Sequence, residues 1–225
     1  MMQRWVRTQR LGMVLAGCLL AGLVITPAAV AQTSASPDTP LISARGFFDY
    51  GYESFAAKQS FTAVFGQSTG SLLGGGAQVV FRNGIYVEIG ASRFKKTGQR
   101  AYVYNGTSYG LGIPLTATLV PLEVTAGYRY RVSPRIVVYG GGGIGSTSYK
   151  ETSQFATASE NVDKRTTSYQ VKAGGEYRIA EWFGVAGEFE YSRVPNILGT
   201  SGVSQAYGEN NLGGTSLHIK FIVGR

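Results

Sequence analysis

Residues 168–193, SYQVKAGGEYRIAEWFGVAGEFEYSR, form two arms in which apolar and polar side chains alternate. In the first arm, one face carries Tyr169, Val171, Ala173, Tyr177 and Ile179, and the other carries Gln170, Lys172, Glu176 and Arg178. In the second arm, Val185, Phe189 and Tyr191 alternate with Glu188 and Glu190. Because a period of two residues is typical of a β-strand, the segment predicts a β-hairpin that turns around Ala180-Glu181.

The distribution of charge over this hairpin favours a membrane location. The polar face combines closely spaced full charges with glycines, and the apolar face ends in aromatic residues. This combination is typical of a strand with lipid on one side and a narrow polar lumen on the other. The alternative is a secreted soluble β-barrel or sandwich with the charges on its solvent face.

The N-terminal residues have the features of a secretory signal peptide. Arg4, Arg7 and Arg10 precede an apolar stretch over 11–25, and Ala29-Val30-Ala31 provides a small-residue cleavage site. We therefore expect residues 1–31 to be removed. The alternative is a lipoprotein signal ending at Cys18, whose thiol would be lipidated.

The remaining chain is expected to comprise a disordered polar leader, 32–43, and one barrel domain, 44–225. Removing residues 1–31 takes away three of the 21 basic residues and no acidic one, which leaves 18 against 13, a net charge of +5. It also removes the only cysteine, so a disulfide framework is excluded. An exported chain of this modest charge without a contiguous basic face is not expected to bind nucleic acid.

Eight alternating segments are found between Arg45 and Gly224. Tight turns are predicted near residues 83, 133 and 180, and long loops at about 56–70, 95–115, 151–165 and 194–211. Within the first loop, residues 61–65 are expected to form a strand extension. Because short connections at one end and long ones at the other are typical of outer-membrane barrels, we predict an all-β, eight-stranded antiparallel up-and-down transmembrane barrel with periplasmic turns and extracellular loops. Aromatic girdles are expected at both rims, with Tyr52, Tyr149, Tyr169 and Tyr191 on the loop side.

On this pattern, residues 45–225 resemble the small outer-membrane β-barrels of the OmpA and OmpX type, and more narrowly the "outer membrane protein beta-barrel domain" proteins. The resemblance implies a location in the bacterial outer membrane, contact with outer-membrane lipid and lipopolysaccharide, and insertion by the barrel-assembly machinery. We expect a monomer with no enzymatic activity, cofactor or metal.

The charged residues on the predicted inner face form a nearly balanced set. The expected lumen charge network consists of Asp49, Glu53, Glu88, Glu123, Arg129, Arg131, Lys172, Glu176, Arg178, Glu188, Glu190 and Lys220. An eight-stranded barrel has room only for its own side chains, and buried charges must be paired. We therefore expect a salt-bridge plug; the alternative is a narrow gated ion path.

Two short motifs suggest chemistry that the rest of the sequence does not support. Gly140-x-Gly142-x-x-Gly145 matches a dinucleotide fingerprint, but no amphipathic helix follows it. We interpret these glycines as relief of crowding that leaves room for Arg or Tyr side chains opposite. Ser216 and the only histidine, His218, share a strand face, and here a hydrogen-bonded lumen histidine is expected rather than a lipid-modifying enzyme.

The remaining candidate for function is the set of loops. Lys95, Lys96 and Arg100 lie among tyrosines in the predicted 95–115 loop. One expectation is that they contact lipopolysaccharide phosphates or an anionic partner. The alternative is that they belong to a solvated loop. The sequence thus predicts a role in envelope integrity or surface interaction with an unidentified ligand, and a lipid-modifying enzyme or small channel is the alternative.

Overall fold

The computed structural model describes residues 41–153 and 161–224. These residues form eight strands and two short helices: β1 (Ile42–Phe55), α1 (Lys58–Phe65), β2 (Thr69–Phe81), β3 (Ile85–Tyr104), β4 (Thr107–Arg131), β5 (Ile136–Ser153), β6 (Val162–Arg178), β7 (Phe183–Arg193), α2 (Gly202–Ala206) and β8 (Gly214–Gly224). The expected signal peptide, the lipidation alternative at Cys18 and nearly all of the 32–43 leader lie outside the described residues.

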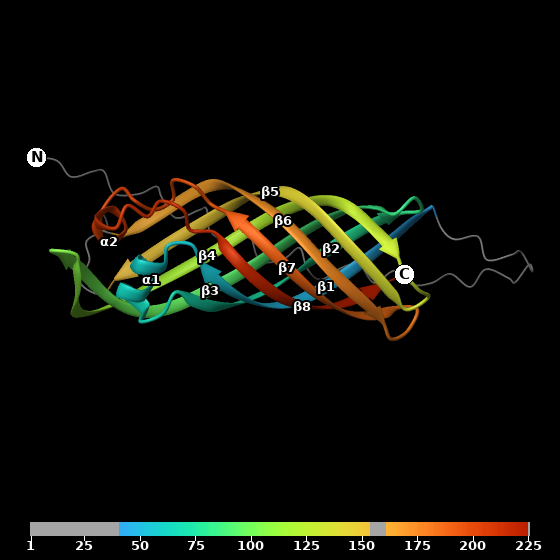
Figure 1. The fold of residues 1–225 in the computed structure, drawn as a ribbon, viewed down its shortest axis with the longest axis horizontal. Helices are drawn as coiled ribbons and strands as arrows, with labels where there is room; N and C mark the ends of the chain where they lie inside the picture. Colours follow the sequence, from blue (N-terminus) through green and yellow to red (C-terminus); the bar gives the residue numbers. More distant parts are fainter. Residues whose placement is uncertain (1–40, 154–160, 225) are drawn as a thin grey trace, which may run out of the picture. The chain divides into compact units, whose positions relative to one another are not determined.

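The strands form a closed antiparallel barrel in sequence order, with β1 paired to β8 (Figure 1). The predicted eight-stranded up-and-down topology is confirmed. The tight turns near 83, 133 and 180 gather at one end, which we call the short-turn end. The helices α1 and α2 and the β3–β4 hairpin gather at the other, the loop end. Among the described residues, no helix has the length and apolarity needed to cross a membrane.

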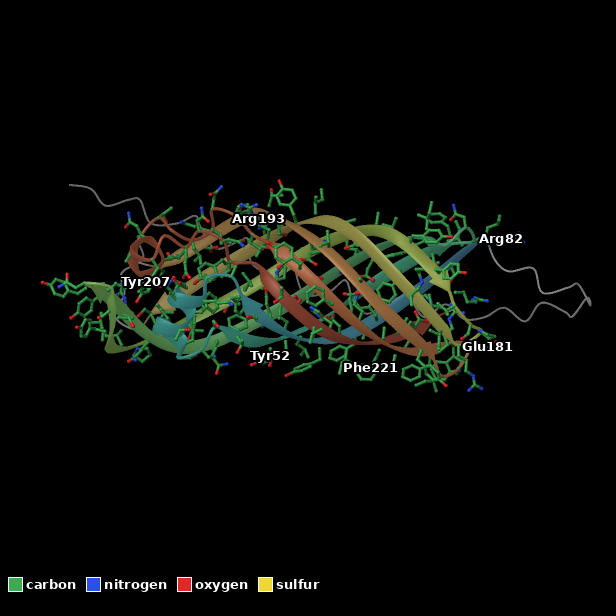
Figure 2. All side chains as sticks on the ribbon, viewed as in Figure 1. Tyr52, Arg82, Glu181, Arg193, Tyr207 and Phe221 are labelled. Atoms are coloured by element: carbon green, nitrogen blue, oxygen red, sulfur yellow. The ribbon has the colours of Figure 1, made fainter. Side chains whose placement is uncertain are left out.

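The outer wall of the barrel is apolar and exposed over its middle. Leu217, Ile144 and Val171, on three different strands, are each more than half exposed. Figure 2 shows Phe221 and Tyr52 projecting from the wall, whereas Arg82 and Glu181 lie at the short-turn end. Because so large an apolar surface is unfavourable in water, the wall is suited to lipid.

The rim aromatics agree with the predicted girdles except at one position. Tyr128, Tyr177 and Tyr169 are about half exposed, but Tyr149 is only 3% exposed. On β5 the odd-numbered residues Val137 and Tyr139 are buried, and the same alternation turns Tyr149 inward. Its assignment to the girdle was therefore wrong.

The loop end differs from the sequence prediction in three segments. The expected 151–165 loop was placed too widely, because β5 continues to Ser153 and β6 begins at Val162. The expected 95–115 loop is a continuation of β3 and β4 that ends in a two-residue turn at Asn105-Gly106. Both turn residues have positive φ, 49° and 76°, which is the backbone conformation of a tight hairpin turn. The expected strand extension at 61–65 is instead part of α1, which ends at Gly66 in the left-handed conformation.

Inward-facing glycines provide space for two lumen tyrosines. A Cβ on Gly141 would lie 2.6 Å from the hydroxyl of Tyr86, and one on Gly174 would lie 2.7 Å from that of Tyr139. The two tyrosine rings meet edge to face, with their centroids 6.2 Å apart. The interpretation of the glycine run as relief of crowding is confirmed for Gly141 and Gly145, but it was wrong for Gly140 and Gly142, where an added Cβ would meet no atom closer than 3.5 Å. No nucleotide-binding helix follows the run.

Candidate functional site

The lumen near the short-turn end is organised by Glu176, whose side chain is fully buried. Arg45 makes a two-pronged contact with it, in which both guanidinium–carboxylate distances are 2.9 Å. Arg129 also donates to Glu176, and Arg178 approaches it at 3.4 Å. One carboxylate thus holds cations from three other positions of the barrel, and these charge-assisted contacts fill this section of the lumen.

The middle of the lumen contains two lysines among three carboxylates. Lys220 Nζ lies 2.9 Å from Glu88 and 2.8 Å from Glu188. Lys172 Nζ lies 3.2 Å from Glu88, 3.7 Å from Glu188 and 3.3 Å from Glu190. These five side chains come from β3, β6, β7 and β8, so their ion pairs cross-link the barrel through its interior.

A third group of lumen side chains lies beside these lysines. The Nδ1 atom of His218 is 2.8 Å from a carboxylate oxygen of Asp49, and its Nε2 atom is 2.8 Å from the hydroxyl of Ser216. All three residues are at most 8% exposed. The cavity that they line has a volume of about 50 Å3, enough for a water molecule or two. We call the charged groups of these three sections the ionic network.

The ionic network contains most, but not all, of the residues that the sequence suggested. Arg131 is exposed beyond the short-turn rim, because β4 ends there, so its assignment to the lumen was wrong. Glu53 is buried and Glu123 half-buried, and both line the small lumen cavity rather than one of the ion pairs described above. Arg45 was missed as a network member, although its strand was predicted to begin there. The charge alternation Arg45, Asp49 and Glu53 on one strand face was the signal that pointed to it.

The lumen is closed at the loop end by apolar side chains. The members of this loop-end cluster are Phe55, Ala57, Phe61, Leu72, Phe94, Ala117, Leu119, Tyr149, Val194, Ile197 and Leu212. Phe55 stacks on Phe61 of α1 at 4.3 Å and meets Phe94 edge to face at 5.0 Å. Residues of the connections, not only of the strands, therefore form a hydrophobic layer over the ionic network.

The carboxylate of Glu209 links the connection that carries α2 to the connection that carries α1. Glu209 accepts the backbone N–H groups of Gln59 and Ser60, at 3.0 and 2.8 Å, and the Ser60 hydroxyl at 2.6 Å. These are the unpaired donors of the first turn of α1, and a negative charge at this end of a helix is favourable. The sequence did not reveal this contact, since Glu209 and Ser60 are 149 residues apart.

Above the loop-end cluster, the connections enclose a second and larger cavity, the outer pocket, of about 390 Å3. Its walls come from α1, from β3 and β4 near the hairpin, from the ends of β5 and β6, and from residues 197–204. Apolar wall residues include Phe65, Leu115 and Val203, and charged ones are Arg100, Glu151 and Lys164. This volume lies within the range of small-molecule sites.

Several polar side chains of the outer pocket are already oriented by neighbours. Tyr149 donates its hydroxyl to the carboxylate of Glu151. Lys164 donates to the hydroxyl of Thr200 at 2.6 Å. Of the three predicted anion contacts, only Arg100 lines the outer pocket; Lys95 and Lys96 are on β3 outside it, and Lys95 is exposed.

Comparison with known protein families shows the family to which the chain belongs. The family model described as "Outer membrane protein beta-barrel domain" matches residues 16–221. The chain belongs to this outer-membrane β-barrel family. It is therefore a protein of the bacterial outer membrane, with the short-turn end toward the periplasm and the loop end toward the exterior. The search of curated proteins finds no match.

Solved structures of other outer-membrane β-barrels share the architecture. Neisserial surface protein A superposes with a TM-score of 0.52 at 10% identity, over 82% of this chain and 97% of that one. A major outer membrane protein from Thermus thermophilus superposes with a TM-score of 0.50 at 8% identity, over 81% and 99% of the two chains. At such low identities, these matches concern the fold alone.

Proposed function

We propose that this outer-membrane barrel is a non-enzymatic surface protein that acts through its loop end, in envelope integrity or in surface interaction. The main observation behind this proposal is that the lumen is closed twice, once by the ionic network and again by the loop-end cluster above it. With lipid against the wall and no open path inside, the loop end is the part of the described barrel that can meet a partner. Outer-membrane lipid and lipopolysaccharide surround it, the barrel-assembly machinery inserts it, and it acts as a monomer.

The plugged lumen is tested by conductance. Purified protein inserted into planar bilayers should give negligible current, because paired lysines and carboxylates lie across the lumen and the cavity beside them has a volume of about 50 Å3. Steady single-channel currents from the wild type would favour the channel alternative instead.

The surface role is tested in a deletion strain complemented with wild-type or altered protein. One variant replaces the hairpin tip, residues 102–109, by a short Asn-Gly turn, and the other is Val203→Asp in the outer pocket. Neither loop-end variant should restore the wild-type phenotype of the deletion strain, measured as uptake of a hydrophobic dye or as surface adhesion. The amount of folded, heat-modifiable barrel should stay the same. Leu217→Val on the lipid-facing wall is the matched control and should complement fully. If both loop-end variants complement as the wild type does, the function lies elsewhere in the barrel.

A lipid-modifying or hydrolytic enzyme is the second candidate, since Asp49, His218 and Ser216 form the hydrogen-bonded chain of a serine hydrolase. Two features weigh against it. The adjacent cavity has no room for an acyl substrate, and across the ladder Ser216 pairs with Glu190, whose carboxylate would oppose a developing oxyanion.

A fluorophosphonate probe distinguishes the two roles. The folded wild type should remain unlabelled, as should Ser216→Ala. Labelling of the wild type that disappears in Ser216→Ala would establish a reactive serine and overturn the non-enzymatic proposal.

A further inference from the structure

The small lumen cavity lies where the ionic network meets the loop-end cluster. Charged side chains of the network line one part of it, and Leu72, Leu119 and Leu212 of the cluster line another. Its volume of about 50 Å3 accommodates a water molecule or two. A charge beside this cavity is therefore compensated mainly by neighbouring side chains and not by bulk water.

The charges around the cavity do not balance. The titratable side chains that line it come from β1, β3, β4, β6, β7 and β8: Asp49, Glu53, Glu88, Glu123, Lys172, Glu188, Glu190, His218 and Lys220. The lining residues from β2 and β5 are uncharged. Six carboxyl groups thus face two lysines and one histidine, so the negative charges are in excess even when the imidazole is protonated.

Glu53 is the carboxyl group with the least compensation. The residue is only 5% exposed, and it makes no hydrogen bond or ion pair with any other residue that the structure describes. The two lysines contact three other carboxylates, and His218 contacts Asp49. An unpaired carboxylate buried this deeply is strongly unfavourable, and such a group becomes neutral by taking up a proton.

The surroundings of Glu53 favour the same outcome, because they are acidic. Ser216 on β8 pairs with Glu53 on one side and with Glu190 on the other, so the two glutamates flank a single residue. Glu123 lines the same cavity from β4. Like charges in one water-poor space disfavour full ionisation, and one bound proton relieves the repulsion among them.

We propose that the folded barrel binds a proton at Glu53, in the group that this residue forms with Glu123 and Glu190. In the unfolded chain Glu53 is exposed to water and releases the proton at neutral pH, where an ordinary glutamate is ionised. The folded state therefore holds one proton more than the unfolded state, and stability falls as the pH rises. The lumen thus contains a pH-sensitive site, and the plug is weaker in an alkaline medium than in a mildly acidic one.

The test is urea unfolding of the barrel in lipid vesicles at pH values of about 6, 7 and 8. For the wild type, the unfolding equilibrium constant should rise roughly tenfold per pH unit, which is the linkage expected for one proton. Glu53→Gln supplies a neutral side chain of the same shape and should remove this rise. Asp163→Asn, in the exposed pair with Lys150, is the matched control and should retain it.

His218 provides the variant that distinguishes this site from its neighbour, since an imidazole also titrates near neutral pH. If His218→Gln removes the rise and Glu53→Gln retains it, the proton belongs to His218 and the proposal is overturned. Constant stability of the wild type over this range would overturn it as well. The same holds if the rise disappears when calcium or sodium replaces choline at constant ionic strength, because a metal cation would then supply the missing charge.

Infrared spectroscopy of the wild type tests the site even if Glu53→Gln does not fold. At neutral pH the folded barrel should show the carbonyl band of a neutral carboxylic acid, and this band should shift when glutamate is isotopically labelled. Absence of such a glutamate band would overturn the proposal.

Discussion

The ionic network and the loop-end cluster close the same lumen by opposite means. In the network, buried side chains from strands on different sides of the barrel are held by charge, as in the contact of Arg45 on β1 with Glu176 on β6. In the cluster, side chains from strand ends and from two connections pack by apolar contact, as in the stack of Phe55, the last residue of β1, on Phe61 of α1. Buried ion pairs require fixed geometry on rigid strands, while apolar packing tolerates irregular connections. The difference explains why the larger cavity is found beside the cluster and not within the network.

Reversing a charge in the network should have the largest effect on stability. Lys172→Glu would place a fourth carboxylate against Glu88, Glu188 and Glu190. Removing one partner of a buried ion pair typically costs about 3–5 kcal/mol, and reversal should exceed this. The change in the free energy of unfolding is measured by urea titration in lipid vesicles, with heat-modifiability on gels as the readout of the folded fraction. Asp163→Asn, in the exposed pair with Lys150, is the control and should change the free energy of unfolding by less than about 1 kcal/mol.

Truncating the centre of the cluster should have the next largest effect. Phe55 is fully buried between Phe61 and Phe94, so Phe55→Ala should cost about 3–5 kcal/mol by loss of contacts and formation of a cavity. Conductance should remain negligible, because the ionic network below is unchanged. A current in this variant would mean that the cluster, and not the network, seals the barrel. Tyr104→Ala, at a side chain that is 64% exposed, is the matched aromatic control.

A smaller effect is expected at the contact between the two helix-bearing connections. Glu209→Gln keeps the shape of the side chain but removes the charge at the first turn of α1, and should cost about 1–2 kcal/mol. Amide hydrogen exchange at Gln59, Ser60 and Phe61 should accelerate, while exchange in β3 and β4 should not. Ser60→Ala removes one hydroxyl and retains both backbone bonds, so it should accelerate exchange less. Equal exchange in all three proteins would show that Glu209 does not hold the helix.

The smallest effect is expected at the tip of the β3–β4 hairpin. Tyr102 and Tyr109 stack on each other with ring centroids 5.3 Å apart, but both are nearly half exposed. Replacing residues 102–109 by Asn-Gly should change the free energy of unfolding by less than about 1 kcal/mol. A large loss of stability would mean that the tip supports the outer pocket below it.

The sequence predicted the strands of the barrel because the alternation of apolar and polar residues with a period of two can be recognised within each short segment. It identified the strands, their inward faces and the three tight turns. The β3–β4 hairpin was missed although Asn105-Gly106 is the same dipeptide as the recognised turn Asn83-Gly84. The residues before the turn, Ala101-Tyr102-Val103-Tyr104, are apolar or aromatic on both faces, so the apolar–polar alternation that marks a membrane strand is absent there.

The sequence by itself determined that this chain is a lipid-facing barrel with a charged interior. It supplied the lysines, arginines and carboxylates of the network, and it placed His218 on the inner face. The tertiary structure alone decided which charges meet: Arg45 and Glu176 are 131 residues apart, and Asp49 and His218 are 169 apart. It also decided that α1 and residues 197–204 fold over the lumen and enclose the outer pocket. The physical reason is that side chains opposite each other in a barrel are brought together by strand closure and stagger, which no local period in the sequence records.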